Sequence, residues 1–128
     1  MNTIIIGIAG GTGSGKTSLA KGILSEYGEG EVAVIEQDSY YNDLSHVLYE
    51  ERVIQNYDHP DSIDIELFES HLQGLLNGEP VNIPTYDFST HVRMDKTNTI
   101  TPHHVIVVEG ILTLHYTQLR DLFAIKIF

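Results

Sequence analysis

Residues 3–17 read TIIIGIAGGTGSGKT, an apolar, mostly β-branched run that passes directly into a glycine-rich loop. A short run that is apolar at nearly every position is typical of a strand buried on both faces, as in a parallel sheet. Residues 10–17 match G-x-x-x-x-G-K-[ST], in which glycines let successive backbone N–H groups face a phosphate. The sequence therefore predicts a phosphate-binding loop between a buried strand and a helix.

The helix expected at residues 16–27 would point the positive end of its dipole at the bound phosphate. Lys16 is expected to reach the β- and γ-phosphates of ATP or GTP and to act in catalysis, and Thr17 is expected to place its hydroxyl on Mg²⁺. A plain glycine-rich turn with a solvated lysine is the alternative. The predicted phosphate-binding residues are Gly10, Gly11, Thr12, Gly13, Ser14, Gly15, Lys16, Thr17 and Ser18.

The rest of the chain alternates strand-like and helix-like segments, which favours an α/β fold with a mainly parallel sheet flanked by helices. Residues 81–101 are expected to form a small β excursion, with short strands at 81–83 and 97–101 flanking a loop. The other expected strands and helices are residues 31–36, 45–55, 64–76, 104–108 and 123–128. We expect one domain over residues 1–128, cut short because no crossover helix follows the last strand.

Composition excludes several classes of protein. The chain has 128 residues, a formal net charge of −11 and no cysteine, so disulfides and thiolate metal sites are excluded and nucleic acid should be repelled. Its longest apolar run falls short of the roughly 18 residues that a membrane span needs, and this run lacks the basic flank of a signal peptide. We expect a cytoplasmic protein with neither nucleic acid nor membrane as a partner.

Three acids are candidates for the chemistry that a bound triphosphate supports. Asp38 follows the strand expected at 31–36, where ligands of open α/β sheets bind, so it is the predicted catalytic base; a turn or N-cap role is the alternative. Glu109 ends the strand expected at 104–108 and is the predicted Mg²⁺ ligand, through water, unless it is a polar strand end. Asp58 either accepts bonds from ribose hydroxyls or forms an Asx turn.

Five blocks of sequence resemble the uridine kinase family, beyond the phosphate-binding loop. The resemblance implies a P-loop kinase fold and ATP- and Mg²⁺-dependent phosphorylation of the 5′-hydroxyl of uridine or cytidine, as in pyrimidine salvage. It implies that Asp38 accepts the hydroxyl proton and that Asp58 holds the ribose. The blocks are QDSYY at 37–41, YDHPDSID at 57–64, IPTYDFSTHVR at 83–93, VIVVEGIL at 105–112 and LRDLFAIKIF at 119–128.

The same resemblance implies a site for the nucleoside. Tyr86 and His91 are expected to recognise the pyrimidine edge, and Phe88 and Tyr57 to form walls around the base, which suits a flat ring. Arg93 belongs to the same segment and is expected to contact substrate. The full set of expected substrate-binding residues is Tyr41, Tyr57, Asp58, Tyr86, Phe88, His91 and Arg93.

Family members continue beyond the position of residue 128 into a lid helix whose arginines clamp the phosphates, so the activity of these 128 residues alone is open. The family's tendency to oligomerise leaves a homo-oligomer as an expectation. A kinase of the phosphoribulokinase type is one alternative, although Tyr86 and His91 stand where a sugar phosphate would favour basic residues. A non-catalytic nucleotide-binding fragment is the other.

Overall fold

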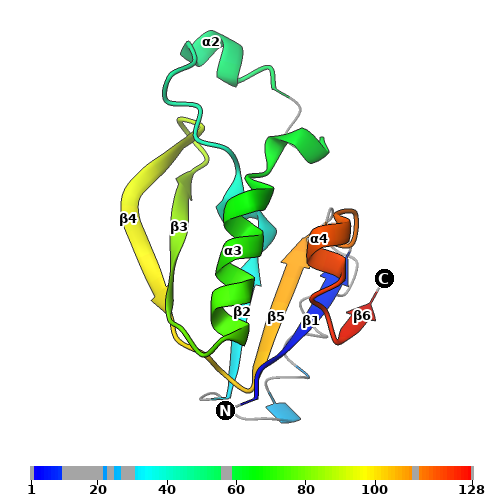
Figure 1. The fold of residues 1–128 in the computed structure, drawn as a ribbon. Coiled ribbons are helices and arrows are strands. Elements are labelled where there is room, and N and C mark those ends of the chain that lie inside the picture. Colours follow the sequence, from blue (N-terminus) through cyan, green and yellow to red (C-terminus); the bar gives the residue numbers. More distant parts are fainter. Residues whose placement is uncertain are drawn as a thin grey trace.

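The computed structural model describes residues 2–9, 22, 25–26, 31–55, 59–110 and 113–127. In this part of the chain, four strands form one parallel sheet in the order β2-β5-β1-β6 (Figure 1). The strands are β1 (Ile4–Ala9), β2 (Val32–Glu36), β5 (Val105–Gly110) and β6 (Ile125–Ile127). The predicted α/β fold with a mainly parallel sheet is therefore confirmed.

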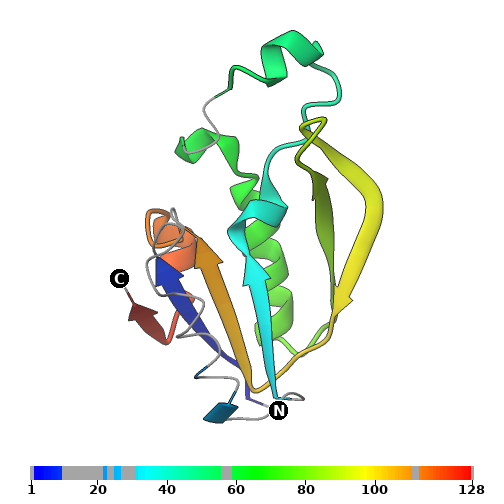
Figure 2. The same cartoon turned by 180° about the vertical axis from the view of Figure 1, so that it is seen from behind.

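The central strands are apolar throughout because both of their faces are buried. Along β5, Ile106 and Val108 join one cluster of buried side chains, whereas Val105 and Val107 join another. Successive side chains of a strand point to opposite faces, so the two clusters lie on opposite sides of the sheet. The views in Figures 1 and 2 are taken from these two sides.

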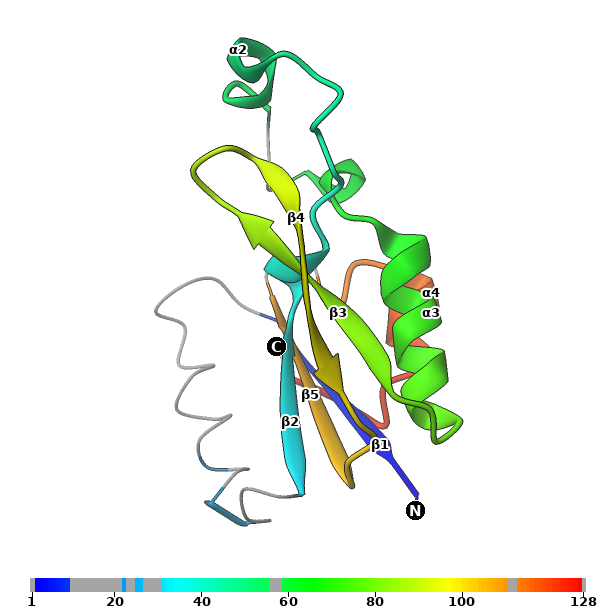
Figure 3. The same ribbon diagram turned by 90° about the vertical axis from the view of Figure 1, so that its left-hand side faces the viewer.

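One face of the sheet is covered by α3 (Ile65–Leu76), which matches the predicted helix at 64–76. Asp64 is its N-cap, and the carboxylate accepts a 3.2 Å hydrogen bond from the backbone N–H of Leu67. The buried residues Phe68, Leu72 and Leu75 face the sheet. Figure 3 shows α3 and α4 (Thr117–Arg120) on the same side of the sheet.

An antiparallel hairpin stands beside the sheet, formed by β3 (Val81–Asp87) and β4 (Val92–Ile100). It confirms a β excursion near 81–101, but the expectation of two short strands around a loop is wrong. Cross-strand pairing continues to Asp87, opposite Val92, and a bulge between Pro84 and Tyr86 accommodates the proline, which cannot donate to a ladder. β3 contacts both the segment after β2 and α3.

Two other expectations were too long. Of residues 45–55, only α2 (Tyr49–Arg52) is helical, and of the described residues 123–127 only β6 is a strand. Phe123 lies before β6, where its buried ring packs over the backbone of Gly7. The expected helix at 16–27 falls mostly outside the described residues. Two single turns complete the described elements, η1 (Gln37–Tyr40) and η2 (Pro60–Ser62).

The hairpin turn and α2 lie beyond the carboxyl ends of the parallel strands (Figure 1). The two are joined there by a 2.9 Å hydrogen bond from Nη1 of Arg52 to the carbonyl oxygen of Thr90. Ligands of open α/β sheets bind at this edge, so the fold places the hairpin where a substrate is expected. None of the described helices is long and apolar enough to span a membrane.

Candidate functional site

β2 passes without a break into η1, the turn that carries Asp38. Gln37 and Tyr40 are buried, so Asp38 lies on the exposed side of η1, at the carboxyl end of a parallel strand. Gly110, at the end of β5, packs against the side chain of Gln37, and a Cβ at this glycine would clash with it. A glycine at position 110 thus allows η1 to lie directly beside the sheet.

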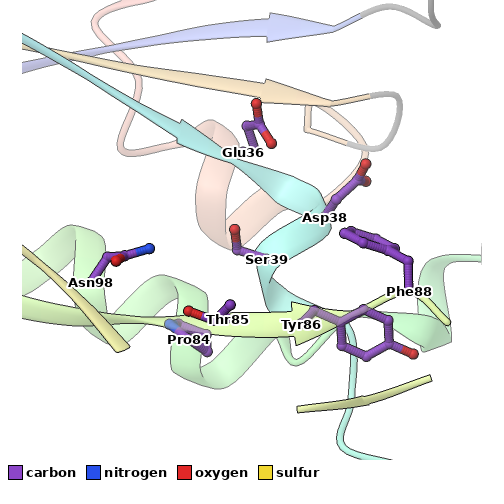
Figure 4. A pocket seen from close by; sticks show the side chains of 8 residues that line it. All are labelled: Glu36, Asp38, Ser39, Pro84, Thr85, Tyr86, Phe88 and Asn98. Carbon is purple, nitrogen blue, oxygen red and sulfur yellow. The ribbon is translucent and has the colours of Figure 1, made fainter. Parts of the chain in front are cut away.

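A pocket of about 130 Å³ lies between η1 and the hairpin (Figure 4). It brings together three residues that the sequence predicted: Asp38, Tyr86 and Phe88. In Figure 4, Asn98 and Phe88 stand at opposite ends of the pocket. The sequence prediction missed the other lining residues, which are Glu36, Ser39, Pro84, Thr85 and Asn98. A signal for some of them was available, because Glu36 and Ser39 flank Asp38 along the chain.

Three aromatic side chains form one cluster at this pocket. The ring centroids of Tyr86 and Phe88 are 5.2 Å apart in an edge-to-face arrangement, and those of Tyr41 and Tyr86 are 5.1 Å apart. Tyr41 also meets Phe88 edge-to-face at 6.3 Å. Tyr41 and Tyr86 are buried, whereas Phe88 is 60% exposed. The cluster therefore has two buried rings and one exposed ring that a flat ligand can contact.

Arg93 bonds to other groups of the protein, one of them in Tyr41 of the cluster. Its Nη2 donates to the carbonyl oxygen of Tyr41 at 3.2 Å and pairs with Oδ2 of Asp64 at 3.3 Å. Its backbone N–H donates to Oδ1 of Asp43 at 3.3 Å. Burial raises the pKa of Asp43, but the backbone and side-chain bonds from Ser45, the backbone bond from Arg93 and the nearby Arg93 charge together hold it below its ordinary value. The expected contact of Arg93 with substrate stays a prediction.

A second link fastens η1 to α3. The hydroxyl of Tyr40 lies 2.7 Å from Nδ1 of His71, and its ring stacks on Phe68 with centroids 4.1 Å apart. Burial raises the pKa of Tyr40, so the hydroxyl stays protonated and acts as the donor. Burial, with the nearby Arg93 charge, lowers the pKa of His71, which favours the neutral ring. Because the hydroxyl of Tyr40 donates, Nδ1 is the acceptor and the ring proton lies on Nε2.

His91 lies at the hairpin turn, just before β4, in the left-handed backbone region with φ of 58°. Its backbone N–H donates to the carbonyl oxygen of Asp87 at 2.8 Å. The carboxylate of Asp87 accepts bonds from Ser89, which lower its pKa. A non-glycine residue with positive φ is uncommon and often marks a functional turn, although His91 does not line the described pocket.

Glu109 is half-buried within β5, where it lies in register with Ile8 of β1 and Glu36 of β2. It does not line the described pocket. Among the residues that the structure describes, no three acidic, histidine or cysteine side chains form a group that could hold a metal. The remaining predicted site residues lie outside the described residues: residues 10–18, Tyr57 and Asp58.

Curated uridine kinases from Clostridium perfringens and Streptococcus thermophilus are 51% and 50% identical to this chain over 125 residues. The alignments cover 98% of this chain, but only 60% and 59% of the two relatives. The chain thus spans about 60% of the length of the curated relatives that it matches.

Solved structures share the fold. A possible uridine kinase from Bacillus stearothermophilus matches with a TM-score of 0.72 at 22% identity, over 98% of this chain and 70% of that one. A phosphoribulokinase from Rhodobacter spheroides also gives a TM-score of 0.72, at 14% identity, over 98% of this chain and 50% of the other. Finally, the family model described as "Phosphoribulokinase / Uridine kinase family" matches residues 5–128. The chain is therefore a member of the phosphoribulokinase/uridine kinase family.

Proposed function

We propose that the protein containing this chain is a kinase that transfers the γ-phosphate of ATP to the 5′-hydroxyl of uridine or cytidine. The observation that carries the proposal is the pocket in which Asp38 lies with Tyr86 and Phe88, at the carboxyl end of a parallel strand. An acid beside an aromatic wall suits a ligand with an alcohol on one side and a flat ring on the other. The 51% identity to a curated uridine kinase supports the pyrimidine nucleoside.

In the proposed reaction, Asp38 accepts the proton of the 5′-hydroxyl as the oxygen attacks the γ-phosphorus. A new O–P bond forms, the bond between this phosphorus and the oxygen bridging to the β-phosphate breaks, and ADP leaves. The aromatic cluster of Tyr41, Tyr86 and Phe88 positions the base, and Tyr86 and His91 recognise its edge. Positioning matters because most of the catalysis in phosphoryl transfer comes from alignment and charge stabilisation.

Glu109, through water, and the hydroxyl of Thr17 are proposed as the protein groups that hold Mg²⁺. A half-buried carboxylate next to the end of β1 fits this ion, which prefers oxygen ligands and keeps several waters and phosphate oxygens in its shell. One protein carboxylate is therefore enough. When bound, Mg²⁺ neutralises charge that develops on the β- and γ-phosphates.

The chain spans about 60% of its curated relatives, so the activity is proposed for the whole protein rather than for these residues alone. We also propose that it acts in pyrimidine salvage in the cytoplasm. The net charge of −11 supports the absence of nucleic acid and anionic membranes as partners. A homo-oligomer remains a proposal from the family resemblance.

The test is ADP release measured in a coupled assay, on the longest form of the protein that its reading frame encodes. The acceptors are uridine, cytidine, ribulose 5-phosphate and none. Release that depends on uridine or cytidine supports the proposal. ADP release with ribulose 5-phosphate alone would show a kinase of the phosphoribulokinase type. Nucleotide binding without ADP release would show a non-catalytic nucleotide-binding protein.

A further inference from the structure

Arg93 lies where three parts of the described structure meet. It belongs to β4 and pairs in register with Tyr86 of β3. Tyr86 and Phe88 line the pocket and form its aromatic wall. Its Nη2 reaches the carbonyl oxygen of Tyr41, the residue that follows η1, and the carboxylate of Asp64, the N-cap of α3. One side chain of the hairpin therefore contacts the C-cap residue of η1, the turn that carries Asp38, and the N-cap residue of α3, the helix that covers the sheet.

The backbone already joins η1 to the start of α3. The N–H of Asp64 donates to the carbonyl oxygen of Tyr40 at 2.7 Å, and Tyr41 forms an isolated antiparallel bridge with Ile63. The guanidinium of Arg93 adds the hairpin to this assembly. The side chains of Arg93 and Asp64 are 24% and 32% exposed, so the pair is partly desolvated and less screened than a surface ion pair.

We propose that Arg93 is a positioning residue: its bonds to Asp64 and Tyr41 hold the wall of Tyr86 and Phe88 at a fixed place relative to Asp38. The inference rests on the proposed nucleoside kinase function, and it differs from the substrate contact expected from the sequence. Arg93 does not line the described pocket, and its Nε is buried. Arg93 affects substrate binding by fixing the position of the hairpin that carries Tyr86 and Phe88.

Two substitutions separate the ion pair from other effects. Asp64→Asn removes the charge, but asparagine is as good an N-cap as aspartate, so α3 stays capped. Arg93→Gln removes the positive partner of the same ion pair. The matched control is Arg120→Gln on α4, an exposed arginine whose Nη2 makes only a local 3.4 Å bond to Thr117 among the bonds described.

Kinetics supply the first readout. Arg93→Gln and Asp64→Asn should each raise the KM for uridine about tenfold, with the KM for ATP nearly unchanged, and the double variant should be no worse than Arg93→Gln alone. Arg93→Lys should restore part of the loss because it keeps the charge. If Asp64→Asn leaves the KM for uridine unchanged while Arg93→Gln raises it, Arg93 contacts the substrate itself and the proposal is overturned.

Hydrogen exchange supplies a second readout that needs no substrate. The amides of β3 and β4 should exchange faster in Arg93→Gln and in Asp64→Asn than in the parent protein, and Arg120→Gln should leave them unchanged. Unchanged exchange in the first two variants would overturn the positioning role. If the two variants exchange faster as expected, yet the parent protein does not phosphorylate uridine, the proposed function fails while the hairpin link stands.

Discussion

At the scale of single residues, the proposed chemistry depends on the carboxylate of Asp38, on the exposed side of η1. Asp38→Asn keeps the shape of the side chain but removes its ability to accept a proton. We expect kcat to fall by about 10²–10⁴-fold, the usual contribution of a general base, while the KM for ATP is nearly unchanged. Steady-state kinetics with Asp95→Asn, an exposed acid on β4, as the control measure this. An unchanged kcat would remove Asp38 from the mechanism.

His91 combines a proposed recognition role with an unfavourable backbone conformation. At its φ of 58°, alanine is strained whereas glycine is not. We expect His91→Ala and His91→Gly to weaken uridine binding equally, because both lack the imidazole. We expect His91→Gly to unfold at a higher urea concentration than His91→Ala, because only alanine is strained at this φ. The KM for uridine and urea unfolding of both variants check this. A normal KM in His91→Gly would show that the imidazole is not used.

The sequence could identify single site residues, but not their partners. Asp38, Tyr86 and Phe88 stand in motifs, so their placement in one pocket was within reach of sequence reasoning. The ion pair of Arg93 with Asp64 joins residues 29 positions apart, and nothing local indicates it. Such pairs are set when the hairpin packs on α3, which a pattern of residue types does not encode.

At the scale of elements, local signals decided how well each was predicted. α3 has a helical apolar period, a capping aspartate and a closing Asn77–Gly78, so its bounds were predicted to within one residue. β4 is mostly exposed and polar, with no alternation of apolar side chains. Its length is determined by pairing with β3, so it appeared in the sequence only as a short strand.

The contact between η1 and α3 should make stability depend on pH. The pKa of His71 is lowered by burial and by Arg93, with Asp64 opposing, so the unfolded chain binds a proton that the folded chain does not. Stability is therefore fully present above the ordinary histidine value of 6.5 and falls as the pH drops through the folded pKa. We expect a lower urea midpoint at about pH 5.5 than at about pH 7.5.

His71→Gln is the matched variant, because its amide oxygen can accept from Tyr40 but does not titrate. The difference in urea midpoint between the two pH values should shrink in this variant. The lowered pKa values of Asp43 and Asp87 do not interfere. Their contribution to the stability of the folded protein is lost only below the ordinary aspartate value of 3.8. An equal pH dependence in both proteins would show that His71 is not the titrating group.

At the scale of the whole molecule, the core and the candidate site are continuous. One cluster of buried side chains contains Leu72 of α3 and Ile106 of the sheet together with the site rings Tyr41 and Tyr86. All-apolar runs favoured a buried parallel sheet, because the strands of such a sheet are covered on both faces and the runs alternate with helical segments. The order β2-β5-β1-β6 was not predictable from them, since similar apolar runs do not specify their neighbours.

This continuity predicts that core and site weaken together. Leu72 is fully buried, so Leu72→Ala should lower the free energy of unfolding by about 2–5 kcal/mol, through lost burial and a cavity under the sheet. The exposed neighbour Gln73→Ala should change it by less than about 0.5 kcal/mol. Urea unfolding measures both.

Because Leu72 shares its cluster with Tyr41 and Tyr86, Leu72→Ala should also raise the KM for uridine at temperatures where it remains folded. A folded Leu72→Ala protein with an unchanged KM would show that the aromatic wall is held independently of the core.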